Sequence, residues 1–274
     1  IGARASPMGT APRNVISGNN AEGIRLSTSN GNTVQGNIIG LNAAGTTALG
    51  NSQLGLLVFL SSGNLIGGNT AATGNIIARN VGGLGFNGGT NNVIRNNFIG
   101  TNTAGADFGN TTEGMNFFGG SNNNTVGGGA GLGNTIAFNN IGVLVTGGTG
   151  NVIFANSIHS NDFLGIDLGN LGVLANDPLD ADTGPNNLQN FPVVSSATFS
   201  GGMLTISYSV PSDPANSAYP LRVEFFKADV DGQEGQTFIG FDTFTAADFA
   251  TGQKTFSFTP IVNTATNEII VSTA

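Results

Sequence analysis

The chain has 274 residues, of which 44 are glycine, and only 9% carry a charge. Hydrophobic residues make up 39%, which excludes a disordered low-complexity chain, and the absence of cysteine excludes disulfides and thiolate metal sites. No apolar run reaches the roughly 18 residues of a membrane span, and no stretch resembles a signal peptide.

The net charge of −8 is unevenly placed along the chain. Residues 1–161 hold three carboxylates against five arginines, whereas residues 162–274 hold thirteen carboxylates against three basic residues. Five scattered arginines do not form the basic stripe that nucleic-acid binding requires, so we expect no nucleic-acid partner. The break near residue 162 predicts a change of segment there.

Two phrases recur through the first part of the chain. Phrases of the form N-x-[VI] start at residues 14, 32, 64, 75, 92, 124, 134 and 151, and equivalent starts lie 59 to 61 residues apart. A glycine followed by an alternating apolar pair starts at residues 23, 55, 83, 114, 142 and 165. Each interval holds three short alternating strands, closed by Gly and Asn, which tolerate the positive φ of tight corners.

This spacing predicts coils that stack on one another, with ladders of asparagine at the corners. We expect one internal column to contain Leu26, Val58, Phe86, Phe117, Val145 and Leu168. The inserts at 41–51 and 101–110 then lie two coils apart, about 10 Å, and we expect them to touch. Ile1 and Gly2 are in phase with the middle of later repeats, so we expect the chain to be a piece of a longer repeat.

The phrases "NVISGN" (14–19), "NTVQGNIIG" (32–40) and "GNTIAFNN" (133–140) resemble right-handed parallel β-helix repeats of the pectate-lyase-like and NosD-like superfamily. The resemblance covers about residues 1–170 and implies a β-helix of about six coils. Residues 165–192 resemble the exit segment that follows such repeats in large bacterial surface proteins. The superfamily contains enzymes, phage tailspikes, adhesins and non-catalytic proteins, so the resemblance implies a fold but no single activity.

The pattern changes from Phe191 onward. Six alternating segments separated by turn residues start at residues 193, 203, 221, 237, 255 and 268. Six short strands in about 80 residues predict a small antiparallel immunoglobulin-like β-sandwich. We therefore expect an all-β chain with a β-helix at 1–172, an acidic linker at 173–190 and a sandwich at 191–274.

The outward positions of the first strand of each coil contain no neighbouring carboxylates. Glu22 and Glu113 are equivalent but lie three coils apart, roughly 14 Å, whereas a glycosidase pair needs roughly 5–9.5 Å. We therefore name no catalytic residue, although catalysis outside these residues stays open. His159 is the only histidine, and nothing in the sequence orients it against Asp162 as part of a triad.

Two sets of residues are candidate binding sites. Phe59 and Phe118 project outward on one column, where sugar rings could stack on them, with Asn87 and Asn116 beside them; alternatively, the inserts bury both rings.

The second set is acidic. Asp177, Asp180 and Asp182, followed by Gly184, resemble an oxygen-rich calcium loop without the distal Glu of an EF-hand. The alternative is a solvated acidic linker. A further acidic turn with Asp229, Asp231 and Glu234 is interpreted as a hairpin tip.

These observations favour a non-catalytic structural or adhesive β-helix protein that is extracellular or attached to the cell surface. The open ends of a solenoid expose unpaired backbone and apolar residues, so we expect self-association end to end into a filament or stalk. The alternative is a polysaccharide-binding or polysaccharide-degrading protein with a glycan as partner. A phage or secretion-system spike shares the fold and is a third possibility.

Overall fold

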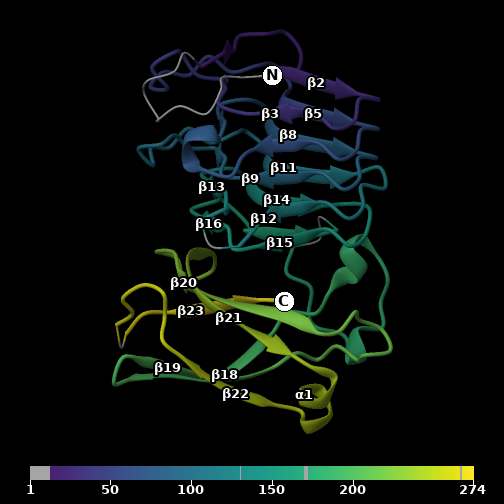
Figure 1. Ribbon diagram of the computed structural model, residues 1–274, viewed down its shortest axis with the longest axis vertical. Coiled ribbons are helices and arrows are strands. Elements are labelled where there is room, and N and C mark those ends of the chain that lie inside the picture. Colours follow the sequence, from purple (N-terminus) through teal and green to yellow (C-terminus); the bar gives the residue numbers. More distant parts are fainter. Residues whose placement is uncertain (1–12, 130, 170–171, 266) are drawn as a thin grey trace.

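The computed structural model describes residues 13–129, 131–169, 172–265 and 267–274. The expected repeat phase at Ile1 and Gly2 lies outside these residues. The first part is a parallel β-helix, whose coils stack in the upper half of Figure 1 and place one strand each in three parallel sheets. We name each sheet after its first strand.

The strands of each sheet follow one another at every third position in the chain. The β1 sheet contains β1 (Val15–Ile16), β4 (Ile38–Ile39), β7 (Ile76–Ile77), β10 (Phe98–Ile99), β13 (Thr135–Ala137) and β16 (Ser157–His159). The β2 sheet contains β2 (Ile24–Ser27), β5 (Leu54–Phe59), β8 (Gly82–Asn87), β11 (Glu113–Phe118), β14 (Ile141–Val145) and β17 (Ile166–Leu168). The β3 sheet contains β3 (Thr33–Val34), β6 (Leu65–Gly67), β9 (Val93–Arg95), β12 (Thr125–Gly127) and β15 (Val152–Phe154).

One internal column runs the length of the β2 sheet, as the glycine phrases predict. Strand register joins its members in the order Leu26, Val58, Phe86, Phe117, Val145 and Leu168. The rings of Phe86 and Phe117 stack with centroids 4.6 Å apart and an interplanar angle of 11°. Inward residues of the other two sheets complete one continuous apolar core. The alternating strands thus fold as predicted because each coil buries its inward residues on those of the next.

The two insert loops pack on the outer face of the β1 sheet. Asn102 Nδ2 donates to the carbonyl of Gly45 at 2.9 Å, so the inserts touch, as their spacing predicts. Leu41 and Phe108 of the inserts form one apolar cluster with outward residues of the sheet and its edge, namely Ile38, Ile76, Ala78 and Phe98. Phe59 and Phe118 are not part of this cluster; both are half-buried on the β2 sheet.

Two antiparallel three-stranded sheets form the second part of the chain, in the lower half of Figure 1. The β18 sheet has the order β18 (Val193–Ser200), β19 (Met203–Ser209), β22 (Lys254–Phe258). The β20 sheet has the order β21 (Gly235–Phe244), β20 (Leu221–Ala228), β23 (Ile270–Thr273). Their facing side chains share one core, which includes Ile206, Tyr208, Val223, Phe225 and Phe244. These six strands are the predicted sandwich.

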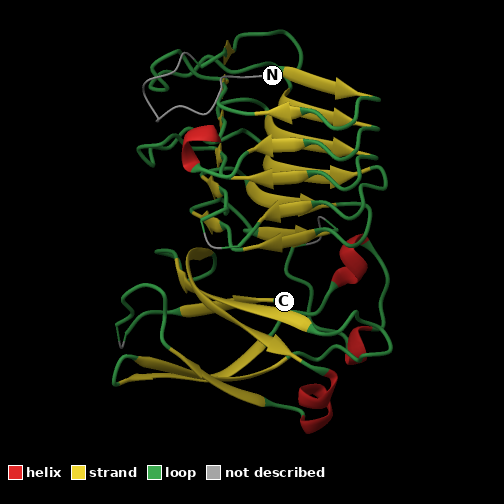
Figure 2. Ribbon diagram, in the orientation of Figure 1, coloured by secondary structure: helices red, strands yellow, loops and turns green. Residues whose placement is uncertain are grey.

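The helices of the described chain are short (Figure 2). The 3₁₀ helix η1 (Ala71–Thr73) lies in a coil corner, and η2 (Pro178–Asp180) and η3 (Pro185–Leu188) lie in the segment between the β-helix and the sandwich. The α-helix α1 (Ala246–Thr251) connects β21 to β22. None of the helices in the described ranges has the length and apolarity needed to cross a membrane.

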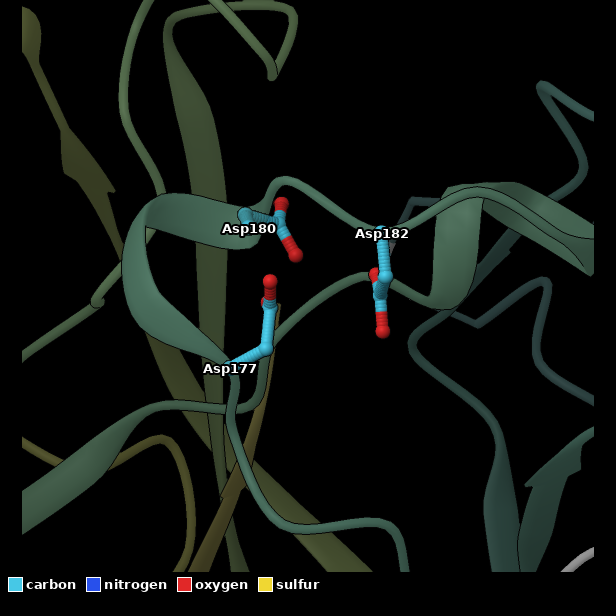
Figure 3. A group of neighbouring side chains, drawn as sticks. All are labelled: Asp177, Asp180 and Asp182. Atoms are coloured by element: carbon cyan, nitrogen blue, oxygen red, sulfur yellow. The ribbon is translucent and has the colours of Figure 1, made fainter.

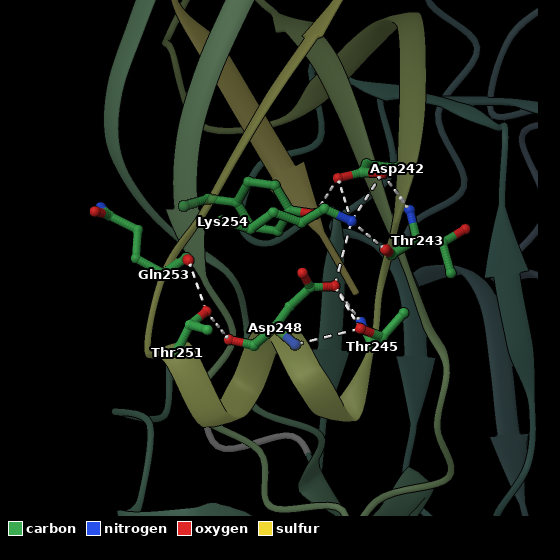
Figure 4. A network of polar contacts seen from close by, with 8 residues as sticks. Asp242, Thr243, Thr245, Asp248, Thr251, Gln253 and Lys254 are labelled. Atoms are coloured by element: carbon green, nitrogen blue, oxygen red, sulfur yellow. Dashed lines mark hydrogen bonds and ion pairs between the residues drawn. The ribbon is translucent and has the colours of Figure 1, made fainter.

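A polar network joins the two sheets of the sandwich at the end that carries α1 (Figure 4). Asp242 accepts a hydrogen bond of 2.7 Å from the hydroxyl of Tyr208, and Lys254 lies 3.1 Å from the same carboxylate. Lys254 also pairs with Asp248 at 3.3 Å, in the first turn of α1, where Thr245 caps the helix. Burial, reinforced by the bond to Asp242, raises the pKa of Tyr208 far above its ordinary value. The network therefore holds β19, β21, β22 and α1 together.

Candidate functional site

Asparagine ladders follow the three corners of the β-helix, as predicted. At most steps, an asparagine donates its backbone N–H and its Nδ2 to the Oδ1 of the asparagine in the next coil. Asn80, for example, donates both groups to Asn110, at 3.0 and 3.3 Å. The ladders contain Asn14, Asn37, Asn75, Asn97, Asn134 and Asn156; Asn19, Asn51, Asn80, Asn110, Asn139 and Asn161; and Asn32, Asn64, Asn92, Asn124, Asn151 and Asn186. A buried amide needs such partners, because leaving it unbonded costs about 1–3 kcal/mol.

The last coil would leave its own donors unbonded, and residues from outside the β-helix accept them instead. Asn186, which lies in η3, accepts from the backbone N–H of Asn151 at 2.9 Å and ends one ladder. Glu234 ends a second ladder, since its two carboxylate oxygens accept from the N–H and Nδ2 of Asn161 at 2.8 and 3.0 Å. The last coil of the β-helix is therefore closed by two parts of the chain: the segment that holds η3, and the sandwich.

Two further carboxylates of the sandwich bind the same coil. Glu224 Oε2 accepts from the N–H of Ala155 at 2.7 Å, and Asp229 Oδ2 accepts from the N–H of Ser160 at 3.1 Å. Asp229 and Glu234 lie in the turn between β20 and β21, which agrees with the predicted hairpin, yet both are buried. We call Glu224, Asp229 and Glu234 the cap carboxylates.

Burial and hydrogen bonding shift the pKa values of the cap carboxylates in opposite directions: burial raises them and bonds from N–H groups lower them. Burial raises the pKa of Glu234 to about 7, against the bonds from Asn161, and the charge of Asp229 adds to the rise. Burial also raises the pKa of Glu224, although bonds from Ala155 and Arg222 oppose it. At Asp229, burial is outweighed by backbone hydrogen bonds, so its pKa is lowered. Asp229 is therefore the ionised member of the pair at neutral pH, while Glu234 is partly protonated.

The three predicted aspartates lie together beside η2. Oxygens of Asp177, Asp180 and Asp182 all lie within 4.8 Å of one another, so the group could hold a metal ion. Figure 3 shows the carboxylates of Asp177 and Asp180 directed toward each other. Asp180 is buried and accepts from Asn190 N and Gln189 Nε2 at 2.8 and 3.1 Å.

The electrostatics of this group fit a cation. Oδ1 of Asp177 is buried and has no hydrogen-bond partner among the described residues, whereas its Oδ2 accepts from Ala181 N at 2.9 Å. Desolvation, followed by the charges of Asp177 and Asp180, raises the pKa of Asp182. Three carboxylate groups with one bare oxygen match the ligand chemistry of hard cations, which take several oxygen ligands.

The predicted sugar-stacking residues occupy one row of the β2 sheet. Register places Phe59 opposite Asn87 and Asn87 opposite Phe118, on three neighbouring strands. Asn116 lies on the same face, opposite Gly85. The guanidinium of Arg25 lies 5.2 Å from the centre of the Phe59 ring. The structure thus brings all four residues onto one face, with Asn87 between the two phenylalanines.

The remaining titratable candidates are dispersed. His159 is half-buried on β16, where Phe138 packs edge-on against it, and burial lowers its pKa while the charge of Asp229 opposes this effect. Its Nδ1 lies 3.1 Å from Ser160 Oγ. Glu22 forms an ion pair of 3.0 Å with Arg25, three coils from Glu113.

Fold and site define the class of the molecule as a parallel β-helix closed by an antiparallel sandwich. No protein-family model matches the chain, and no curated protein matches it in sequence.

The cap residues are the ones that sequence reasoning missed. Asn186 lacks the N-x-[VI] phrase that the other five members of its own ladder carry, and Glu234 lies 73 residues from the asparagine that it binds. The only available signal was the acidic composition after residue 162, which does not say where those carboxylates point. Their role follows from tertiary contact alone.

Proposed function

We propose that the chain is a non-catalytic structural module, a rigid spacer in which β-helix and sandwich act as one body. The observation that carries this proposal is the cap: the last coil is bonded directly to Glu224, Asp229 and Glu234 of the sandwich. A buried hydrogen bond contributes about 0.5–1.5 kcal/mol, and more where its acceptor is ionised, so the bonds of the cap hold the two parts together.

A distance measurement between two spin labels tests this rigidity. Because the chain has no cysteine, Asn69→Cys on the β-helix and Ala247→Cys on α1 give two unique and exposed labelling sites. A rigid spacer gives one narrow distance distribution, and the double variant Glu224→Ala/Glu234→Ala broadens it. A broad distribution in the otherwise unaltered chain would refute the spacer.

We further propose that the spacer associates end to end through its first coil. Strands β1 and β2 pair with a neighbour on one edge only within the described ranges, whereas the last coil is covered by the cap carboxylates. Stacking on such an edge adds backbone bonds and apolar contact. Electron microscopy checks this: linear oligomers joined through the first coil support it, and particles in which the first coil touches no second copy contradict it.

The proposal includes kinship with the pectate-lyase-like and NosD-like β-helix proteins and a location outside the cell, attached to a surface. The repeat phrases and the Asn ladders that they form support the kinship. Detection of the native protein in the extracellular or surface fraction of its source cells tests the location; its confinement to the cytoplasm would contradict it.

The alternative function is polysaccharide binding or cleavage, favoured by the row of Phe59, Asn87 and Phe118. Two aromatic faces on the same side of one sheet, with an asparagine between them, suit the flat faces and hydroxyls of sugar rings. A glycan array followed by lyase and hydrolase assays tests this alternative. Binding that is lost in Phe118→Ala and kept in Phe163→Ala, an exposed ring elsewhere, supports it. Absence of binding to every glycan removes it.

We also propose calcium as the cation for Asp177, Asp180 and Asp182. The bare Oδ1 of Asp177 supports this assignment, since a buried unpaired carboxylate oxygen is costly without a partner. Three carboxylates leave the other positions of a six- to eight-coordinate ion to carbonyls and water.

Thermal unfolding with CaCl₂ and with EDTA tests the calcium assignment. Calcium raises the midpoint of the unaltered chain because an ion that binds only the folded state stabilises it. Asp177→Asn abolishes the shift, whereas Asp231→Asn, a matched change at an exposed aspartate, keeps it. Equal shifts in both variants would contradict the site.

A further inference from the structure

The edge of the β18 sheet that strand β18 forms differs in sequence and exposure from the rest of the sandwich. β18 pairs with β19 along one side, and within the described part of the chain no strand pairs with its other side. An exposed edge strand presents unpaired N–H and C=O groups, so natural proteins protect such edges with charges, proline or short length. β18 is eight residues long, and six of them are exposed.

β18 lacks these protections. Its sequence, VVSSATFS, contains no charged residue, no proline and no glycine. The opposite edge of the same sheet, β22, is shorter at five residues and begins with Lys254. Residues 191–274 otherwise carry eight carboxylates against three basic residues, so the uncharged edge is an exception in an acidic module.

The outer face of the β18 sheet is also uncharged and is built from small hydroxyl side chains. Register aligns Thr198, Thr205 and Ser257 in one row and Ser196, Ser207 and Thr255 in the next. The hydroxyls of Thr205 and Ser257, and those of Ser207 and Thr255, lie 2.8 Å apart. The residues that β18 contributes to these rows, Ser196 and Thr198, have short side chains that lose little rotamer freedom on contact, which lowers the cost of association.

We propose that β18 pairs with β18 of a second copy, antiparallel about a twofold axis, and so joins two three-stranded sheets into one. A twofold contact is self-complementary, and an uncharged strand places no like charges opposite each other. The register is regular from Ser196 to Ser200, beyond a bulge between Val194 and Ser196. The pairing therefore centres on Thr198, which lies opposite Thr198 of the second copy.

This inference does not depend on the proposed spacer function, because it concerns the side of the sandwich and not the coil end. Sedimentation or light scattering over a concentration series shows a monomer–dimer equilibrium. Thr198→Lys places two ammonium groups opposite each other and shifts the equilibrium to monomer by at least about tenfold in dissociation constant, that is 1.4 kcal/mol. Thr255→Lys, on the same face but the opposite edge, keeps the dimer.

A cross-link supplies an independent readout. The single thiol of Thr198→Cys forms a disulfide-linked dimer on mild oxidation, since directly opposite Cβ atoms of paired strands lie about 4.5–5.5 Å apart. Thr255→Cys stays monomeric under the same oxidation. A strictly monomeric chain, or a dimer that resists Thr198→Lys and fails to cross-link at residue 198, would overturn the inference.

Discussion

Glu234 binds Asn161 as the next ladder asparagine would, since its two carboxylate oxygens accept from the backbone N–H and the Nδ2 of Asn161 at 2.8 and 3.0 Å. An asparagine would meet these donors with a single Oδ1. The carboxylate supplies one oxygen to each donor and ends the ladder without a further coil. A solenoid end, usually a liability, thus becomes an intramolecular interface.

Replacing Glu234 with glutamine, which cannot ionise, changes how the free energy of unfolding depends on pH. The pKa of Glu234 in the folded chain, about 7, exceeds the 4.5 of the free side chain, so the folded state binds the proton more tightly. The stabilisation that protonated Glu234 gives the folded chain is complete below about pH 4.5. It is lost as the pH rises through 7, and the free energy of unfolding then falls by on the order of 2 kcal/mol. The free energy of unfolding of Glu234→Gln, measured by urea titration from pH 5 to 8, does not show this decline.

Asp231→Asn is the control for that comparison, because Asp231 is exposed in the same turn. It keeps the decline of the unaltered chain. The groups around Glu234 that also titrate are Asp229, Glu224 and His159. An identical slope in the Glu234→Gln and unaltered chains would assign the pH dependence to those neighbours and contradict the prediction.

Loss of one ladder member in the middle of the β-helix destabilises the fold. Asn110→Ala removes the acceptor of two bonds from Asn80, at 3.0 and 3.3 Å; the buried backbone N–H of Asn80 loses its partner, whereas its Nδ2 keeps the carbonyl of Ala78 at 3.0 Å. We expect a loss of about 2–4 kcal/mol in the free energy of unfolding. Denaturant titration measures it. Asn69→Ala, at an exposed corner, changes stability by less than about 0.5 kcal/mol; equal effects would contradict the ladder's role.

Phe117 and Phe118 are adjacent on β11 but point to opposite sides of the sheet. Phe117 is fully buried and stacks on Phe86 at 4.6 Å, whereas Phe118 is half-buried on the outer face. Phe117→Ala leaves a cavity in a core that cannot collapse and costs about 3–5 kcal/mol. Phe118→Ala costs less than half as much. Thermal unfolding of both variants distinguishes them, and the reverse order would show that the coil core is misassigned.

Close packing of neighbouring coils explains one corner glycine. A Cβ on Gly109 would lie 1.7 Å from the carbonyl oxygen of Phe138 in the next coil, so Gly109→Ala forces the backbone apart. We expect a loss of at least about 2 kcal/mol. Gly129→Ala adds a Cβ with no atom within 4 Å and stays within about 1 kcal/mol of the unaltered chain. A tolerated Gly109→Ala would mean that the coils separate easily.

Local patterns account for what the sequence predicted correctly. The column from Leu26 to Leu168 follows from two-residue alternation. In a strand, every second side chain points to the same face, and this does not depend on the neighbouring strands. The Asn corners follow from the same repeat, because equivalent positions must superimpose when coils stack. The sandwich strands carry the same local alternation.

The closure of the β-helix was decided only by tertiary structure. Asn161 and Glu234 are 73 residues apart, and no periodic pattern relates a coil corner to a hairpin turn. Whether a carboxylate in "DVDGQE" is a solvated tip or a buried acceptor depends on how the sandwich is oriented against the last coil. Sequence by itself determined the repeating unit, since repetition is a local property; the folded chain decided how the repetition ends, since the donors of a last coil bond whichever acceptors the rest of the chain brings near them.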